Sequence, residues 1–200
     1  MQKSGLPSDQ RTGGKDITGC RFSLSIMSDG YISMILNAIK NVNTQNVWSA
    51  TDALSTVYRG RRIHVVDAIK GFFANAYDEG AHMTLEATFS RGSPADIDGD
   101  CVFASSSERL NQTDKKFPVI CKAALYPLGV CEYSAHIAHA ISLAEKQGVL
   151  KRVSHYAYEL EGDVHDLFDY FDEVMAYAEE GVDHYVLQVT LSVNSPTQSG

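Results

Sequence analysis

Thr51–Gly60 has the sequence TDALSTVYRG, and a segment of the same form, VSHYAYELEG, occupies Val153–Gly162, 102 positions further along the chain. Each copy is a short run with the side-chain pattern of a β-strand, ends in a glycine and leads directly into an amphipathic helical pattern. The repetition predicts that the chain contains two copies of one structural unit.

The two copies differ in their polar side chains. Asp52, Ser55 and Thr56 place short polar groups on a segment that otherwise resembles a buried strand. The same columns of the second copy hold Ser154, Ala157 and Tyr158. A strand hydroxyl can be satisfied by the backbone, or it can remain unpaired and line a binding pocket. The clustering favours a pair of related pockets, one of which has changed.

Outward from these segments, each half of the chain predicts the same series of elements. The first half predicts strands at Arg21–Met27, Val47–Ala50, Leu54–Arg59 and His82–Arg91, with one helix ending near Asn41 and another before Gly80. The second half predicts strands at Val119–Tyr126, Leu150–Ser154, Tyr156–Glu161 and His184–Val193, with helices at Tyr133–Lys146 and His165–Glu179. Both halves therefore have the order βαββαβ.

This order predicts an α+β fold, a tandem repeat of two ferredoxin-like βαββαβ units with antiparallel sheets. We expect a flexible N-terminal tail at residues 1–18, repeat 1 at 19–92, a linker at 93–116 and repeat 2 at 117–196. Polar side chains alternate along one predicted strand, at Thr84, Glu86, Thr88 and Ser90. Such an orderly polar face, left open by the helices, predicts a homodimer formed sheet to sheet.

Composition excludes several classes of function. The 200-residue chain has a net charge of −8, which argues against nucleic-acid binding. No run approaches the roughly 20 apolar residues of a membrane span, and no apolar core of a secretory signal is present. The four cysteines, Cys20, Cys101, Cys121 and Cys131, have no CxxC spacing, so we expect reduced structural thiols in a cytoplasmic protein and no metal.

The candidate catalytic groups have simpler explanations. His64 and His165 occupy matching places near the start of a helix, where partly exposed first-turn residues are expected. The acidic residues from Asp163 to Glu173 favour a solvated helix face, and the aromatic residues at helical spacing favour core. No motif pairs a nucleophile with a base, so the sequence predicts no catalytic residue and no cofactor. Binding is better supported than catalysis.

Several motifs resemble those of one known family. FSLSIM (22–27) and AALYPLG (123–129) are similar to the first-strand motif of the YkoF-like proteins, and VWSATDALSTVYRG (47–60), SHYAYELEGDVHDLF (154–168) and VTLSVNSP (189–196) add to the resemblance. The resemblance covers the chain from Gly19 to Pro196. It implies tandem ferredoxin-like repeats that bind thiamine and its hydroxymethylpyrimidine (HMP) moiety. It further implies a cytoplasmic homodimer without catalysis, acting in precursor uptake or salvage, with a functional link to a vitamin transporter.

The resemblance also implies the ligand-binding residues. In repeat 1 they are Leu24 and Thr56, with Asp52 and Ser55 as neighbours. In repeat 2 they are Leu125 and Tyr158, the residue that aligns with Thr56, with His155 nearby. The sequence departs from the family pattern at Ser25-Ile26, where Tyr-Pro is usual, and at Tyr158, where a small hydroxyl residue is usual.

These departures predict that the two repeats bind unequally. Repeat 1 keeps two small hydroxyls and Glu86, an acid that could face a thiazolium cation, whereas repeat 2 has Tyr158, Ala157 and Gln188. A bulky phenol in a pocket costs more than one lost hydrogen bond, so we expect repeat 1 to be the tighter site. Tyr158 stacking on the pyrimidine is the opposite possibility. An enzyme acting on a thiamine precursor and a purely structural oligomerisation module are the alternative functions.

Overall fold

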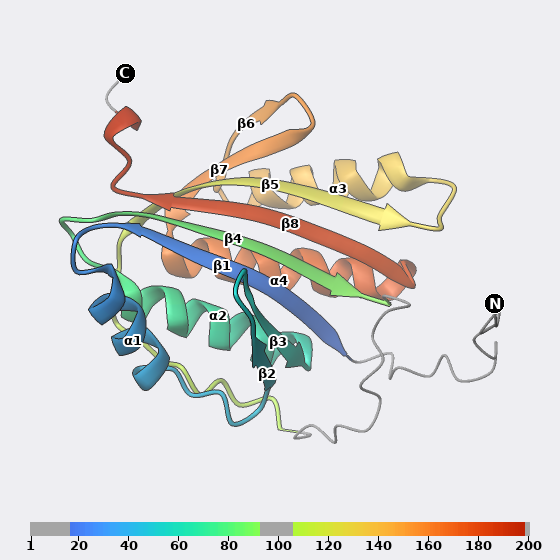
Figure 1. The fold of residues 1–200 in the computed structure, drawn as a ribbon. Helices are drawn as coiled ribbons and strands as arrows, with labels where there is room; N and C mark the ends of the chain where they lie inside the picture. The colour runs from blue at the N-terminus through green and yellow to red at the C-terminus, as the bar shows by residue number, and fades with distance from the viewer. Residues whose placement is uncertain (1–16, 93–105, 199–200) are drawn as a thin grey trace, which may run out of the picture.

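The computed structural model describes residues 17–92 and 106–198, and it confirms the repeated element order (Figure 1). The first unit consists of β1 (Thr18–Met27), α1 (Tyr31–Asn41), β2 (Trp48–Thr51), β3 (Thr56–Gly60), α2 (Arg62–Ala76) and β4 (His82–Arg91). The second consists of β5 (Pro118–Leu128), α3 (Tyr133–Lys146), β6 (Leu150–Ser154), β7 (Ala157–Asp163), α4 (Val164–Gly181) and β8 (His184–Val193), followed by the short helix η1 (Pro196–Gln198). Residues 1–16 of the predicted tail and 93–105 of the predicted linker lie outside the described residues.

The strands of both units form one eight-stranded antiparallel sheet in the order β2-β3-β1-β4-β8-β5-β7-β6. Each unit contributes the four-stranded antiparallel sheet that its ferredoxin-like pattern predicts. The sequence did not indicate that the two sheets would join. They join because β4 pairs with β8 along its length, from Met83↔Val193 to Arg91↔Tyr185. The pairing satisfies backbone groups that would otherwise line two exposed sheet edges.

The helices cover one face of this sheet (Figure 1). Apolar residues alternate toward the helices, as Met83, Leu85 and Phe89 of β4 do, and all three are fully buried. The intervening β4 residues are partly or fully exposed on the other side. We call that side, represented by Arg21, Glu86 and Gln188, the open face. An antiparallel sheet with one covered and one solvated face produces this alternation.

The first helix of each unit packs differently. α3 packs against β5, β6 and α4, whereas α1 packs mainly against α2. The side chains of Ile32, Leu36 and Ile39 on α1 remain 57%, 60% and 55% exposed. A longer connection follows α1 (residues 42–47) than follows α3 (147–149), so α1 is less closely tied to its strand. The outward side of α1 therefore offers an apolar stripe that is not part of the core.

The described part of the predicted linker lies along α2. We call residues 106–117 the strap. His64 Nε2 lies 2.8 Å from the carbonyl oxygen of Ser106, and Lys115 Nζ donates to the carbonyl oxygen of Ala74 at 2.9 Å. At the far end, His165 Nε2 lies 3.0 Å from the Lys115 carbonyl oxygen. The expectation of a partly exposed His64 was wrong: with the strap over it, only 2% of the residue is exposed.

Other features of the chain have simple roles. Cys20 and Cys121 are free and buried, and burial raises the pKa of both thiols, as expected of structural cysteines. Cys131 is free but exposed, which does not fit that expectation, and Cys101 lies outside the described residues. The aromatic residues that the helical spacing assigned to the core, Phe72, Phe73, Phe168, Tyr170 and Phe171, are buried. Within residues 17–92 and 106–198, no helix is long and apolar enough to cross a membrane.

Candidate functional site

The predicted site residues of repeat 1 divide between the two sides of the sheet. β1 and β3 pair with Phe22 opposite Thr56, and residues directly opposite in an antiparallel pair point to the same side. Phe22 is buried under the helices, so Thr56 also faces the helices. Leu24, two residues beyond Phe22 on β1, shares that side. Leu24 and Thr56 are both half-buried, so each has a surface that a small molecule could contact.

The Thr56 hydroxyl has a partner. Its Oγ1 lies 3.0 Å from Oγ1 of Thr51, which is the paired residue on β2. The expectation of an unpaired hydroxyl was therefore wrong. Each hydroxyl has one proton and two lone pairs, so the pair uses one proton and leaves the other free to donate. Together the two groups can still donate one hydrogen bond and accept others.

Asp52 lies in the turn between β2 and β3, as the limits of the predicted strands imply. Ser55, which was expected on the second strand, lies in the same turn because β3 begins at Thr56. Asp52 Oδ1 accepts the backbone N–H groups of Leu54 at 2.7 Å and Ser55 at 2.9 Å. These N–H groups hold the pKa of Asp52 below its ordinary value. This is the usual chemistry of an Asx turn, which explains the aspartate without a ligand.

The tip of this hairpin borders a hollow of about 360 Å³ on the open face. Its lining includes Arg21, Ser23, Asp52, Ser55, Glu86 and Gln188. Glu86 is paired with Ser23 across β4 and β1, on the side opposite to Thr56. The structure therefore does not bring Glu86 together with Thr56, and the acid expected beside a thiazolium belongs to a different surface.

In repeat 2 the corresponding position is filled. Tyr158 is paired with the buried Ala123, so it faces the helices, and both Tyr158 and Leu125 are only 2% exposed. The Tyr170 hydroxyl lies 3.0 Å from the carbonyl oxygen of Ala140 and 2.9 Å from the Tyr158 hydroxyl. Because a carbonyl only accepts, Tyr170 donates to Ala140 and Tyr158 donates to Tyr170. Burial raises the pKa of Tyr158 to about 12.

The remaining predicted residue, His155, lies at the exposed tip of the β6–β7 hairpin. Its ring is 6.5 Å from that of Tyr156, which is 98% exposed. Tyr156 has a positive φ of 63°, which a tight turn imposes on it. His155 and Tyr158 are therefore placed apart, one on the surface and one in the core.

Aligning the two repeats at their offset of 102 residues shows how they differ around Thr56 and Tyr158. Thr56 and Ala68 of repeat 1 correspond to Tyr158 and Tyr170 of repeat 2. Repeat 1 has its rings elsewhere: Phe22 contacts Tyr58 at 4.9 Å and Phe72 at 5.3 Å between ring centroids. Sequence reasoning missed Ala68 and Tyr170, although the repeat offset pairs them directly. Two small side chains in repeat 1 replace two phenols, and Leu24 is accessible where Leu125 is not.

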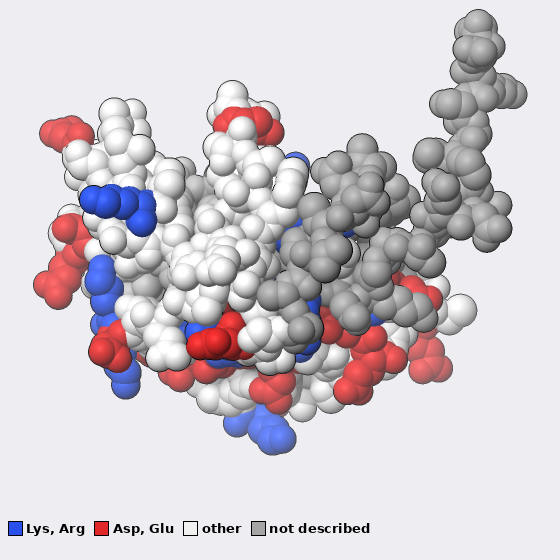
Figure 2. Space-filling view, turned by 90° about the horizontal axis from the view of Figure 1, so that it is seen from below, with Lys and Arg blue, Asp and Glu red and all other residues white. Residues whose placement is uncertain are grey.

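The β2–β3 hairpin, which carries Thr56, and α1 both protrude from the surface (Figure 2). The two protrusions are separated by a notch and are mostly uncharged, with acidic atoms at the tip of the hairpin protrusion and basic atoms on the other. The exposed apolar residues of these elements are Tyr31, Ile32, Leu36, Ile39 and Leu54. We call this region the α1–hairpin notch. Apolar walls with a few hydrogen-bonding groups are typical of small-molecule sites.

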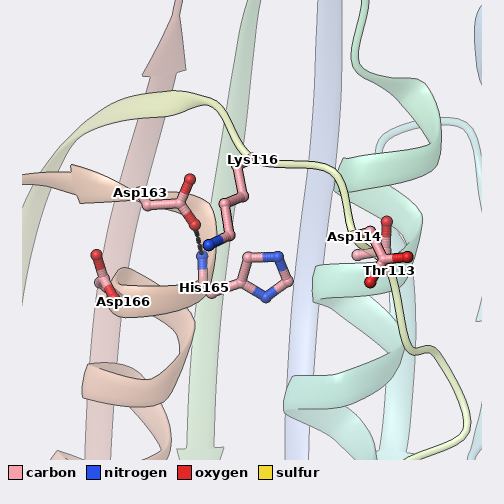
Figure 3. Close-up of a pocket in the computed structure, with 6 residues that line it drawn as sticks. All are labelled: Thr113, Asp114, Lys116, Asp163, His165 and Asp166. Carbon is pink, nitrogen blue, oxygen red and sulfur yellow. Dashed lines mark hydrogen bonds between the residues drawn. The ribbon is translucent and has the colours of Figure 1, made fainter.

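A second hollow, of about 410 Å³, lies where the strap meets α4 (Figure 3). It is lined by Thr113, Asp114, Lys116, Asp163, His165 and Asp166. Asp163 accepts the backbone N–H of His165 at 3.0 Å and so caps α4. Among the residues that the structure describes, no group of His, Cys, Asp and Glu side chains is arranged to hold a metal ion. The polar groups of this hollow are explained by the helix cap and the strap.

Comparison with known proteins gives one consistent result. Residues 17–96 and 118–198 each match the model of the YKOF-related Family. The chain is also 39% identical over 189 residues to a Bacillus subtilis (strain 168) protein named "Putative HMP/thiamine-binding protein YkoF". That alignment covers 93% of this chain and 94% of the relative.

Proposed function

This chain belongs to the YkoF-related family, and from that premise we propose that it binds thiamine through the HMP moiety, without catalysis. The name of the Bacillus subtilis relative supports this class of ligand. We place the site in the α1–hairpin notch of repeat 1, at Leu24 and the Thr51–Thr56 hydroxyl pair. The observation that carries this assignment is the contrast between repeats, since Tyr158 and Tyr170 fill the same position in repeat 2.

The chemistry of the notch suits an aminopyrimidine. The ring offers nitrogen acceptors and an amine donor. The hydroxyl pair has one free proton that can donate to a ring nitrogen, and free lone pairs that can accept from the amine. Leu24 and the apolar stripe of α1 can cover the ring faces. Each hydrogen bond contributes on the order of 1 kcal/mol, so a few of them with an apolar slot give roughly micromolar affinity. Such affinity suits a carrier or a sensor.

Calorimetric titration tests the ligand class. We expect HMP and thiamine to bind and the isolated thiazole to give no heat, because the proposed contacts are to the pyrimidine. Absence of heat with every pyrimidine compound at about 100 μM protein would refute the proposal. Chromatography of the same mixtures tests the enzyme alternative, which conversion of any compound would establish.

We also propose that two chains associate through their open faces. The support is the uncovered side of the eight-stranded sheet, where polar residues such as Glu86 and Gln188 are exposed. On family grounds we place the protein in the cytoplasm, in uptake or salvage of thiamine precursors, with a functional link to a vitamin transporter. A deletion strain that depends on external HMP tests this role, and growth as fast as the parent's at limiting HMP would contradict it.

A further inference from the structure

Asn111 of the strap joins two segments that are far apart in the sequence. Its Oδ1 accepts the backbone N–H of Asn43 at 2.7 Å, and its Nδ2 donates to the Asn43 carbonyl oxygen at 2.9 Å. The side-chain amide therefore pairs with both backbone groups of Asn43, in the connection between α1 and β2. The second proton of Nδ2 goes to Asp67 Oδ2 on α2, at 2.8 Å. Every hydrogen-bonding group of the amide has a partner.

Asp67 and Gly71 fix the position of Asn111 on α2. Asp67 Oδ2 also accepts the backbone N–H groups of Leu110 at 2.9 Å and Asn111 at 3.0 Å. Asp67 is 3% exposed and Asn111 is 7% exposed, so the bonds form away from water. One helical turn beyond Asp67, a Cβ built on Gly71 would lie only 2.5 Å from Cβ of Asn111. Glycine at this position lets the strap approach the helix closely.

This arrangement fixes the position of the chain just beyond the C-terminal end of α1. Asn43 lies two residues beyond the last residue of α1, which packs mainly against α2. In repeat 2, α3 packs directly against β5 and β6, so its position does not depend on such a brace. The bonds of Asn111 thus hold the α1–β2 connection at a fixed place on α2. A shift of this connection would change the separation of α1 from the β2–β3 hairpin.

We propose that Asn111 is a positioning residue for ligand binding, which sets the width of the α1–hairpin notch through Asn43, Asp67 and Gly71. The inference rests on the proposed function, because the notch is the proposed HMP site. Asn111 does not contact the ligand. It keeps α1 in place so that the apolar stripe meets the ring, and the affinity of repeat 1 depends on it.

Two variants with one matched control test the inference by calorimetry with HMP. Asn111→Ala removes the brace, and Gly71→Ala displaces Asn111 while replacing glycine with a better helix former. We expect each to weaken HMP binding by about tenfold, the size of other long-range coupling effects. Lys115→Ala removes a different strap bond, from Nζ to the Ala74 carbonyl oxygen, and we expect an affinity within about twofold of wild type.

Amide hydrogen exchange supplies a readout without ligand. The Asn43 N–H should lose its protection in Asn111→Ala and keep it in Lys115→Ala, with both proteins folded by circular dichroism. If wild type binds HMP, and Asn111→Ala and Gly71→Ala both bind it as tightly as wild type does, the inference is wrong and the proposed function stands. Equal weakening by Lys115→Ala also overturns it, since general loosening of the strap would then explain the effect. A wild type that binds no HMP overturns both.

Discussion

At the scale of single residues, Thr56 shows that a strand hydroxyl can have a partner and still keep hydrogen-bonding capacity. Its bond to Thr51 fixes the orientation of both side chains. The pair retains a proton and lone pairs for a third group. A binding group held in place by a neighbour loses less conformational entropy when the ligand arrives.

Replacing Thr56 with valine removes the hydroxyl while keeping the shape of the side chain. We expect HMP affinity to fall by about fivefold to tenfold, since one hydrogen bond contributes about 1 kcal/mol. Thr56→Ser should restore most of the binding in the same calorimetric assay. Thr84→Val is the matched control, because Thr84 is a half-buried threonine on the open face of β4. Equal losses in Thr56→Val and Thr84→Val would contradict the assignment.

The two buried phenols of repeat 2 allow a prediction about stability. Tyr170→Phe leaves the buried Tyr158 proton without an acceptor, at a cost of about 1–3 kcal/mol in the free energy of unfolding. Tyr158→Phe removes a donor but leaves the Tyr170 bond to Ala140 intact, so it should cost only about 1 kcal/mol. Urea unfolding of the two variants checks this order. A larger loss of stability in Tyr158→Phe would mean that Tyr170 donates to Tyr158 instead of accepting from it.

Some of these residue roles could be predicted from the sequence, and others could not. The repeat offset placed Thr56 over Tyr158, and the buried Tyr158 agrees with a filled position in repeat 2. Asp52 was correctly left in the turn between the two predicted strands, whereas Ser55 was assigned to the second strand, which in fact begins at Thr56. No sequence pattern indicated the role of Asn111, because its partners Asn43 and Asp67 are distant in sequence and its own segment has no periodicity.

At the scale of elements, α1 packs mainly against α2 and leaves an apolar stripe exposed. Helical spacing of Ile32, Leu36 and Ile39 predicted the helix, but periodicity alone does not say what an apolar face contacts. In the structure this stripe is exposed. The corresponding positions of α3 hold Ser134, Ala138 and Ile141. The difference agrees with a site kept in repeat 1 and closed in repeat 2.

Giving α1 the residues of α3 tests this interpretation. We expect the double variant Ile32→Ser, Leu36→Ala to change the free energy of unfolding by less than about 1 kcal/mol, because both side chains are mostly exposed. Its HMP affinity should fall, because the apolar wall of the notch is lost. Ile35→Ala, at a half-buried position packed on the core, is the contrasting control and should cost about 2 kcal/mol or more. If the double variant lowers the free energy of unfolding by as much as Ile35→Ala does, the apolar stripe must be covered in solution.

At the scale of the whole molecule, the pairing of β4 with β8 makes the two repeats one sheet. Both βαββαβ orders could be predicted, since alternation and helical periodicity are local. The joining could not, because either edge strand could equally have remained exposed or paired elsewhere. The continuous sheet leaves one broad open face on a chain whose other face carries the helices α1, α2, α3 and α4 (Figure 1).

Association through that face has a direct consequence for mass. The chain has a mass of 21.9 kDa, and light scattering should return about twice this value at micromolar concentrations. Glu86→Arg places a reversed charge on the open face and should shift the equilibrium toward the monomer. Glu145→Arg, on the exposed surface of α3, is the charge-matched control. A wild-type mass near that of one chain would rule out the dimer.

The location of the HMP site is tested most directly by amide chemical-shift mapping during titration of the labelled protein with HMP. We predict that the largest shifts will cluster at Leu24, Thr56 and the residues of α1, with little change around Leu125 and Tyr158. The Thr56→Val variant should lose these shifts at the same HMP concentration. Shifts centred on Tyr158, or on Glu86 and the open face, would show that HMP binds elsewhere than in the α1–hairpin notch.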